Sequence, residues 1–142
     1  MRKGMNHYGY RDLRPGMKAS FDAVLDEEKL DMFRKITGDI NPLHNDRSYA
    51  ESKGYRERVV FGMLSASLMS TLAGVYLPGE KSLIQSVESK FIKPVLLDDV
   101  ITVTGEITDM NDSVQRIELR VTMTNDRGEK VLKGKMQVLV NG

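Results

Sequence analysis

The side-chain types best suited to moving protons near neutral pH come together in the stretch from Thr37 to Ala50. Asp39 and His44 lie five positions apart there, with Asn41 and Pro42 between them. Because proline interrupts a helix and biases the residue before it away from the helical region, one continuous helix does not carry both side chains. We therefore predict a tight loop that presents a carboxylate and an imidazole to one small molecule.

The same residues also suit a purely structural loop. An aspartate can cap a turn, Asn-Pro is a common turn signal, and a histidine can bond to nearby backbone groups. Taken alone, a D-x-N-P-x-H string favours this structural interpretation. The residues around the string must decide between the two.

A wider pattern favours the catalytic interpretation. The string T-G-D-x-N-P-L-H-x-D-x-x-x-A, which begins at Thr37, is followed by V-V-F-G-M-L-S-A-S-L-M-S, which begins at Val59. In this order and at this separation, the two blocks resemble the MaoC-like dehydratase family, which includes the (R)-specific enoyl-CoA hydratases. The resemblance covers roughly Leu25 to the C-terminus.

The resemblance implies reversible addition of water to trans-2-enoyl thioesters, giving (R)-3-hydroxyacyl thioesters. It implies that Asp39 and His44 are the catalytic pair, and we expect Asp39 to be the general base and His44 to orient the water and donate a proton. Asn41 matches a position that helps to fix the site. Gly62 matches the glycine whose N–H receives the thioester oxygen, and unpaired amides at a helix N-terminus suit that role. Ser70 aligns with a serine near the catalytic residues of some members, although a bond back to its own helix explains it equally well.

Two further features bear on substrate selection. Many members carry histidine immediately before the glycine, where this sequence has Phe61, which cannot donate a hydrogen bond. We therefore expect altered selection near the carbonyl, or lower activity. Lys90 and Lys93 are candidates to bind the phosphates of coenzyme A or the arm of an acyl carrier protein, but lysines at a strand end are also typical of a solvated surface.

Composition argues against several other classes of protein. Lys plus Arg number 21 against 20 for Asp plus Glu, and the charges are interspersed, so we expect no nucleic-acid partner. The absence of cysteine excludes disulfides and Cys-ligated metal, and we expect no metal site and a cytoplasmic location. No apolar segment follows the basic residues 1–4, which argues against a secretory signal. The mainly apolar stretch 59–77 is interrupted by serines and glycines, so we expect no membrane span.

The 142 residues suit a single domain, 1–142, with residues 1–16 as an N-terminal arm. We expect His7 in this arm to be solvated rather than catalytic. A strand is expected over residues 17–24, followed by a helix from the cap Asp26 to Gly38 that packs through Leu30, Phe33 and Ile36. A short helix is expected between Asp46 and Gly54. An apolar helix is expected over residues 63–74, buried on all sides.

Four strands are expected after Ser82, because each run alternates polar and apolar residues or is rich in β-branched ones. They cover residues 83–92, 100–107, 114–123 and 131–140 and predict an antiparallel meander with the apolar helix on one face. The fold class is thus α+β. The family resemblance implies the hotdog fold, in which an antiparallel sheet wraps around a long helix, and pairing into a homodimer or a higher homo-oligomer.

We therefore expect a hydratase (a lyase) whose substrate brings its own coenzyme A or acyl carrier, with no separate cofactor. Two alternatives stay open. A hotdog thioesterase would direct water to the thioester carbonyl, and the Asn-Pro-x-His block argues against it. A non-catalytic acyl-thioester-binding subunit would fit the departure at Phe61. The sequence does not decide acyl chain length, branching, pathway or the choice of carrier.

Overall fold

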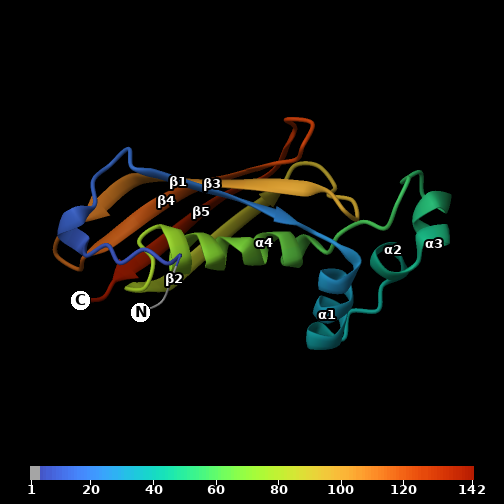
Figure 1. The fold of residues 1–142 in the computed structure, drawn as a ribbon, viewed down its shortest axis with the longest axis horizontal. Helices are drawn as coiled ribbons and strands as arrows, with labels where there is room; N and C mark the ends of the chain where they lie inside the picture. Colours follow the sequence, from blue (N-terminus) through green and yellow to red (C-terminus); the bar gives the residue numbers. More distant parts are fainter. Residues whose placement is uncertain (1–3) are drawn as a thin grey trace.

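In the computed structural model, which describes residues 4–142, a curved antiparallel sheet wraps one long helix (Figure 1). The strands are β1 (Lys18–Val24), β2 (Ser82–Phe91), β3 (Val100–Asn111), β4 (Arg116–Thr124) and β5 (Lys130–Val140). Their order across the sheet is β1-β3-β4-β5-β2. This is the α+β hotdog arrangement that the family resemblance implied, and that prediction is confirmed.

The predicted four-stranded meander is wrong in one respect. Strands β3, β4 and β5 follow one another as a meander, but β2 pairs with β5 and lies at the edge opposite β1. The connection 92–99 therefore crosses the end of the sheet before β3 begins. Turn signals report which strands are joined by short loops, whereas the partner of β2 is set by contacts between residues far apart in the sequence.

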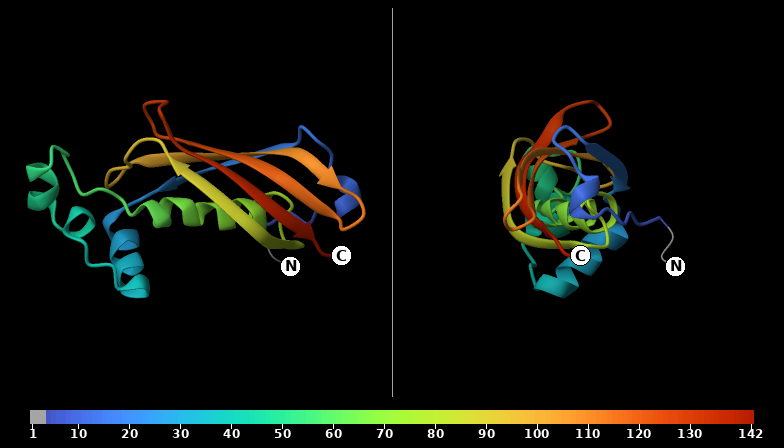
Figure 2. Two further views of the ribbon diagram at one scale, coloured as in Figure 1. Left: turned by 180° about the vertical axis from the view of Figure 1, so that it is seen from behind. Right: turned by 90° about the vertical axis from the view of Figure 1, so that its left-hand side faces the viewer.

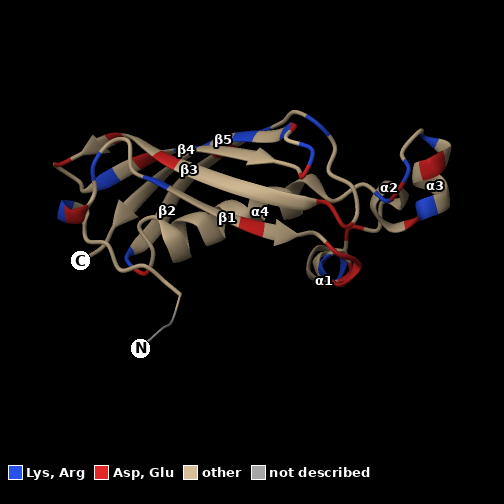
Figure 3. Ribbon diagram, turned by 45° about the horizontal axis from the view of Figure 1, so that its top comes forward, with Lys and Arg blue, Asp and Glu red and all other residues tan. Residues whose placement is uncertain are grey.

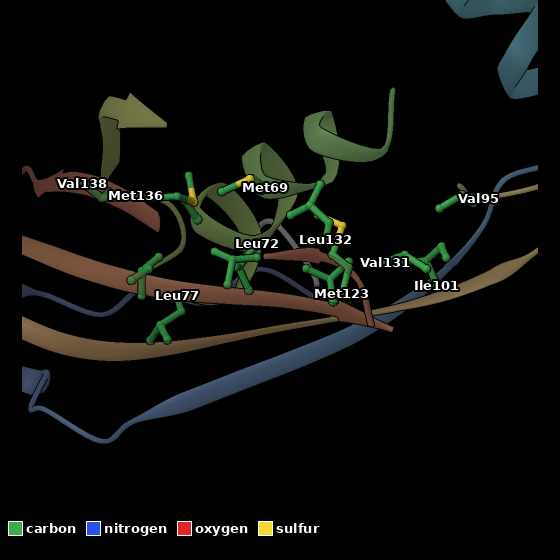
Figure 4. Packing of buried hydrophobic residues seen from close by; sticks show 14 of the residues in the cluster. Met69, Leu72, Leu77, Val95, Ile101, Met123, Val131, Leu132, Met136 and Val138 are labelled. Atoms are coloured by element: carbon green, nitrogen blue, oxygen red, sulfur yellow. The ribbon is translucent and has the colours of Figure 1, made fainter. Parts of the chain in front are cut away.

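The central helix α4 (Gly62–Thr71) continues into a wider turn, η2 (Leu72–Tyr76), and lies against the concave face of the sheet. Two glycines in the sheet allow this close approach: a Cβ on Gly134 would lie 2.7 Å from the Met69 Cε atom, and one on Gly105 would lie 2.7 Å from a Leu72 methyl carbon. Figure 4 shows Met69 and Leu72 of this helical segment beside Met123, Leu132 and Met136 of the sheet. Close packing of these side chains stabilises the core and holds α4 against the sheet.

One face of α4 is open, although the sequence predicted a helix buried on all sides. Met63 is 67% exposed, and Ser67 and Ser70 are also exposed. The prediction is wrong for a single chain because the sheet covers only one side of the helix. On the neighbouring edge strand β2, Val87 is 50% exposed, so the apolar surface continues from helix to sheet edge.

Three helices project beyond the sheet at one end, as Figure 2 shows: α1 (Glu27–Thr37), α2 (Pro42–Asn45) and α3 (Arg47–Ser52). The predicted caps are confirmed, since Asp26 accepts from the Lys29 N–H and Asp46 from the Tyr49 N–H. Of the three side chains expected to pack, Leu30 is buried and Phe33 is partly buried, but Ile36 is 80% exposed. Packing of Ile36 was wrongly predicted because the end of α1 extends past the sheet.

The N-terminal arm packs along the opposite end of the molecule. It contains the short helix η1 (Tyr10–Asp12), and the His7 Nδ1 atom lies 2.8 Å from a carboxylate oxygen of Glu80. The His7 side chain is 46% exposed, which agrees with the solvated position expected for it. Residues 1–3, part of the segment considered for a secretory signal, lie outside the described residues. No helix within residues 4–142 is both long and apolar enough to cross a membrane.

Candidate active site

The loop after α1 places the Asp39 carboxylate. Gly38 ends the helix in a left-handed conformation, with φ of 75°, which glycine adopts at little cost. The Asp39 N–H donates to the Thr37 hydroxyl over 3.2 Å, and the Asp39 Oδ1 atom accepts from the Asn41 N–H over 3.1 Å. The loop thus holds one carboxylate oxygen in place while the side chain remains exposed.

Asn41 shapes the same loop. Its side-chain oxygen caps α2 by accepting from the Leu43 N–H over 2.9 Å. The Asn45 amide donates to the backbone oxygens of Asn41 and Asp39, over 2.8 and 3.2 Å. These bonds are consistent with the expected orienting role of Asn41, because they fix the backbone between Asp39 and α2.

The His44 imidazole is oriented by two contacts. Its Nδ1 atom lies 2.7 Å from the Val59 carbonyl oxygen, which can only accept, so Nδ1 carries the hydrogen. In the neutral ring the Nε2 atom therefore holds a lone pair. The ring also lies on Phe61, with ring centroids 4.5 Å apart and planes tilted by 31°.

Arg58 holds the His44 backbone and was not predicted from the sequence as a site residue. Its side chain is 9% exposed, and the Nε atom donates to the His44 carbonyl over 2.8 Å. The guanidinium lies 3.5 Å from the Asp31 carboxylate and 3.7 Å from that of Glu27. A buried, paired arginine thus ties the loop to α1; no sequence pattern distinguished it from its charged neighbours.

Phe61, the departure from the family pattern, is only 2% exposed and precedes the first residue of α4. It packs between His44 and Phe33, whose ring centroid is 4.9 Å away. As the N-cap residue it offers no side-chain hydrogen bond, so no side chain caps the first amides of α4 at Gly62. These amides and the helix dipole make the helix N-terminus a suitable place for developing negative charge.

Two adjoining hollows meet at these residues. Asp39, His44 and Gly62 all line one of about 380 Å³, which we call the catalytic hollow. His44 and Gly62 also line a second of about 300 Å³, which we call the apolar hollow. Phe91 belongs to both, and its ring covers Gly62 so closely that a Cβ there would lie 3.1 Å from it. The other residues of the apolar hollow include Leu43, Val60, Val95, Val131 and Leu132.

Ser65 lines the apolar hollow and was not recognised from the sequence. It is 2% exposed, and its hydroxyl lacks a hydrogen-bond partner within the described residues. Because it follows Gly62 by three positions, it lies on the same side of α4, and this spacing was the available signal. The predicted Ser70 lies eight positions after Gly62, is exposed, and lines neither hollow.

The two candidate lysines lie in different places. Lys93 lines the apolar hollow, and its ammonium donates to a carboxylate oxygen of Glu129 over 2.6 Å. This hydrogen bond, with those from Asn125 and Arg127, lowers the pKa of Glu129 from 4.5 to about 2. Lys90 lines neither hollow and belongs to the outer face of the sheet. Within residues 4–142, no three His, Asp or Glu side chains gather closely enough to hold a metal ion.

Comparison with known proteins identifies the family. A family model described as MaoC like domain matches residues 11–128. The chain belongs to the MaoC-like family. It is 31% identical over 134 residues to the (R)-specific enoyl-CoA hydratase of Rhodospirillum rubrum, covering 94% of this chain and 92% of that protein. It is 29% identical over 128 residues to the enzyme of that name from Aeromonas caviae, covering 90% and 96%.

Solved structures agree with this assignment. The unliganded R-hydratase PhaJ1 of Pseudomonas aeruginosa superimposes with a TM-score of 0.89 at 29% identity, covering 94% of this chain and 85% of that one. The (R)-hydratase of Aeromonas caviae gives a TM-score of 0.88 at 28% identity, covering 92% and 98%. The MaoC-like resemblance inferred from the two sequence blocks is therefore confirmed.

Proposed function

We propose that this MaoC-like protein catalyses the reversible hydration of trans-2-enoyl thioesters to (R)-3-hydroxyacyl thioesters. The observation that carries the proposal is that Asp39, His44 and the uncapped N-terminus of α4 at Gly62 line one hollow. The reaction needs a water aimed at Cβ, a proton for Cα and donors for the negative charge on the thioester oxygen. The curated relatives named as (R)-specific enoyl-CoA hydratases support the same activity.

Asp39 and His44 hold the attacking water as two hydrogen-bond acceptors. The His44 Nδ1–H is engaged by the Val59 carbonyl, so the neutral ring accepts one water hydrogen at Nε2. The Asp39 carboxylate accepts the other and serves as the general base. As the C–O bond to Cβ forms, a proton passes from water to the Asp39 carboxylate, and the electrons of the double bond move toward the thioester oxygen. The protonated Asp39 then gives this proton to Cα, which restores the carboxylate and completes the 3-hydroxyacyl thioester. His44 fits the role of water orienter; it donates a proton only after Nε2 has acquired one.

The amide of Gly62 receives the thioester oxygen. Negative charge develops on this oxygen as water adds to Cβ, and an unpaired N–H at a helix N-terminus stabilises it without reorganisation. The acyl chain occupies the apolar hollow, whose walls include Val60, Val95 and Leu132. The Ser65 hydroxyl lies on the same wall and donates a second hydrogen bond to the thioester group of the substrate.

Incubation with crotonyl-CoA, longer enoyl-CoA thioesters and carrier-bound enoyl thioesters tests the proposal. We expect loss of the absorbance of the conjugated bond, formation of the (R)-3-hydroxyacyl product, and no release of free thiol. Thiol release without hydration would indicate a thioesterase. Tight binding without turnover of any substrate would indicate a non-catalytic acyl-binding subunit.

We also propose that two copies of the chain form a homodimer through α4 and the edge strand β2. The exposed apolar side chains Met63 and Val87, together with the unpaired backbone of an edge strand, support this contact. Light scattering after gel filtration should give the dimer mass, and Val87→Glu should shift it toward the monomer. A single domain, a cytoplasmic location and the absence of a separate cofactor stay predictions.

A further inference from the structure

The outer face of the sheet, turned away from α4, carries a hollow of about 570 Å³ that we call the basic hollow. Figure 3 marks the lysine and arginine positions of β5 in blue along its ribbon. A volume of this size is typical of small-molecule sites, which span roughly 300–1,000 Å³. One carboxylate, that of Glu88, and five cations line the hollow: Lys90, Arg120, Lys130, Lys133 and Lys135.

The strand register places like charges directly opposite each other in this hollow. Lys90 of β2 faces Lys133 of β5, and Arg120 of β4 faces Lys135 of β5. Like charges in directly opposed positions destabilise a sheet. The second pair is compensated, because Glu88 lies 3.9 Å from Lys135 and Glu106 lies 2.8 Å from Arg120.

The first pair has no such compensation: within residues 4–142, neither Lys90 nor Lys133 forms an ion pair with a carboxylate. Lys133 and Arg120 stand on β5 and β4, which lie inside the sheet, so protection of a sheet edge does not account for them. An anion bound between the lysines would remove the repulsion.

The basic hollow lies back to back with the apolar hollow. Successive residues of a strand point to opposite faces of the sheet. Lys90 and its neighbour Phe91 therefore point to opposite faces, as do Lys133 and its neighbour Leu132. Lys90 and Lys133 line the basic hollow, whereas Phe91 and Leu132 line the apolar hollow. Lys93, two positions after the end of β2, also lines the apolar hollow, so the two hollows adjoin at this end of the strand.

We infer that the basic hollow binds the phosphate groups of a coenzyme A thioester, while the pantetheine arm passes the end of β2 and brings the acyl group to Gly62. This assignment rests on the proposed hydratase function, which supplies the thioester. Ammonium groups bind phosphate oxygens through charge-assisted hydrogen bonds, and a concave site of this volume suits a small polyanion. An acidic carrier protein is the competing occupant, and the experiment separates the two.

The test compares the double variant Lys90→Ala/Lys133→Ala with the intact protein on three crotonyl thioesters: those of coenzyme A, of N-acetylcysteamine, which has no phosphate, and of an acyl carrier protein. Lys18→Ala is the matched control, because Lys18 lies on the same face at the far edge strand β1. We expect the double variant to lose about tenfold or more of its preference for the coenzyme A ester over the N-acetylcysteamine ester, through KM. The control should keep that preference.

Each other outcome overturns the inference. An equal loss on all three esters would mean that the lysines act through the fold or the common acyl site. No loss on any ester would mean that the cations are only solvated. A loss confined to the carrier-protein ester would make this surface a protein-docking site instead of a phosphate site.

Binding of coenzyme A itself, measured by titration calorimetry, separates this inference from the proposed function. If the protein hydrates none of the esters but the double variant binds coenzyme A about tenfold more weakly, the phosphate site stands and the hydratase proposal fails. If hydration proceeds while coenzyme A binds equally to both proteins, the hydratase stands and the phosphate site fails.

Discussion

The imidazole of His44 lies on the ring of Phe61, with 4.5 Å between the ring centroids. Phe61, which departs from the family pattern, thus packs directly against the proposed catalytic histidine. Phe61 donates no hydrogen bond, but its buried ring limits the tilt of the imidazole while the Val59 carbonyl fixes its rotation. At this position the chain therefore supplies packing against His44 rather than a hydrogen-bond donor.

Phe61→Leu should lower kcat more than it changes KM. The smaller side chain leaves His44 free to tilt, and misplacement of a catalytic group by about 1 Å can cost up to about a hundredfold in rate. We expect a fall in kcat of about tenfold, and a loss of roughly 1–2 kcal/mol in the free energy of unfolding from the lost packing. Steady-state kinetics with crotonyl-CoA and urea denaturation measure the two effects.

Phe33→Leu is the matched control for that experiment. Phe33 contacts Phe61 with ring centroids 4.9 Å apart, whereas within residues 4–142 no ring contact joins Phe33 to His44. Its replacement should cost a similar free energy of unfolding with a smaller effect on kcat. If both variants lose kcat to the same extent, general loosening of the site explains the result and Phe61 has no specific effect on His44.

Asp39→Asn should lower kcat by about 10² to 10⁴-fold with little change in KM, because the amide keeps the shape of the carboxylate but does not accept the proton. The amide oxygen can still accept from the Asn41 N–H, so the loop should be retained. Asp46→Asn is the control, because asparagine caps a helix about as well as aspartate does at that position. Full activity of the Asp39 variant would contradict its assignment as general base.

Local signals explain most of the fold that the sequence predicted. The cap Asp26, the stop at Gly38 and the alternation of the strands act through residues close in sequence, and these elements are found within a few positions of their predicted bounds. The pairing of β2 with β5 and the exposure of Ile36 depend instead on which distant segments meet. Hydrophobic periodicity predicts which face of an element is apolar, but it does not say whether another segment covers that face.

The residues of the site also divide into those that local sequence predicts and those that depend on distant contacts. Asp39 lies in the loop before α2 and His44 lies within α2, five positions later, with the cap Asn41 between them, so spacing and turn chemistry were enough to bring the carboxylate and the imidazole to one hollow. Which serine of α4 faces a hollow depends on the rotation of the helix against the sheet. The family resemblance suggested Ser70, with a bond back to its own helix as an equal alternative, whereas Ser65 lines the apolar hollow. Arg58 contributes through a backbone contact to His44 that no motif encodes.

The pKa of Glu129 gives a pH dependence that can be measured. Hydrogen bonds from Lys93 first, then from Asn125 and Arg127, lower it from 4.5 to about 2. A carboxylate whose pKa is lower in the folded protein than in the unfolded chain stabilises the fold at pH values above the unfolded-chain pKa. This contribution is lost as the pH falls through the folded-protein pKa. The difference in denaturation midpoint between the intact protein and Glu129→Gln should therefore be constant above about pH 4.5 and shrink toward pH 2.

Lys93→Met should make the stabilisation by Glu129 disappear at a higher pH, because the substitution removes the largest cause of the lowered pKa of Glu129. The measurement is the urea midpoint at intervals from pH 2 to neutral pH. Curves for the intact protein and Glu129→Gln that stay parallel across the acid range would mean that the Lys93–Glu129 contact is absent in solution.

The buried hydroxyl of Ser65 predicts opposite effects on stability and on activity. An unsatisfied hydroxyl costs roughly 1–3 kcal/mol in the folded protein, so Ser65→Ala should raise the free energy of unfolding by about 1 kcal/mol once the lost packing is subtracted. If the hydroxyl donates to the bound thioester, the same change should lower kcat/KM by about tenfold. Ser67→Ala is the control on the same helix, because the exposed Ser67 hydroxyl already donates to the Leu64 carbonyl over 2.6 Å. A Ser65→Ala protein that is more stable and equally active would show that the hydroxyl has no partner in the substrate, whereas the combined gain and loss is what a binding group held ready for a ligand requires.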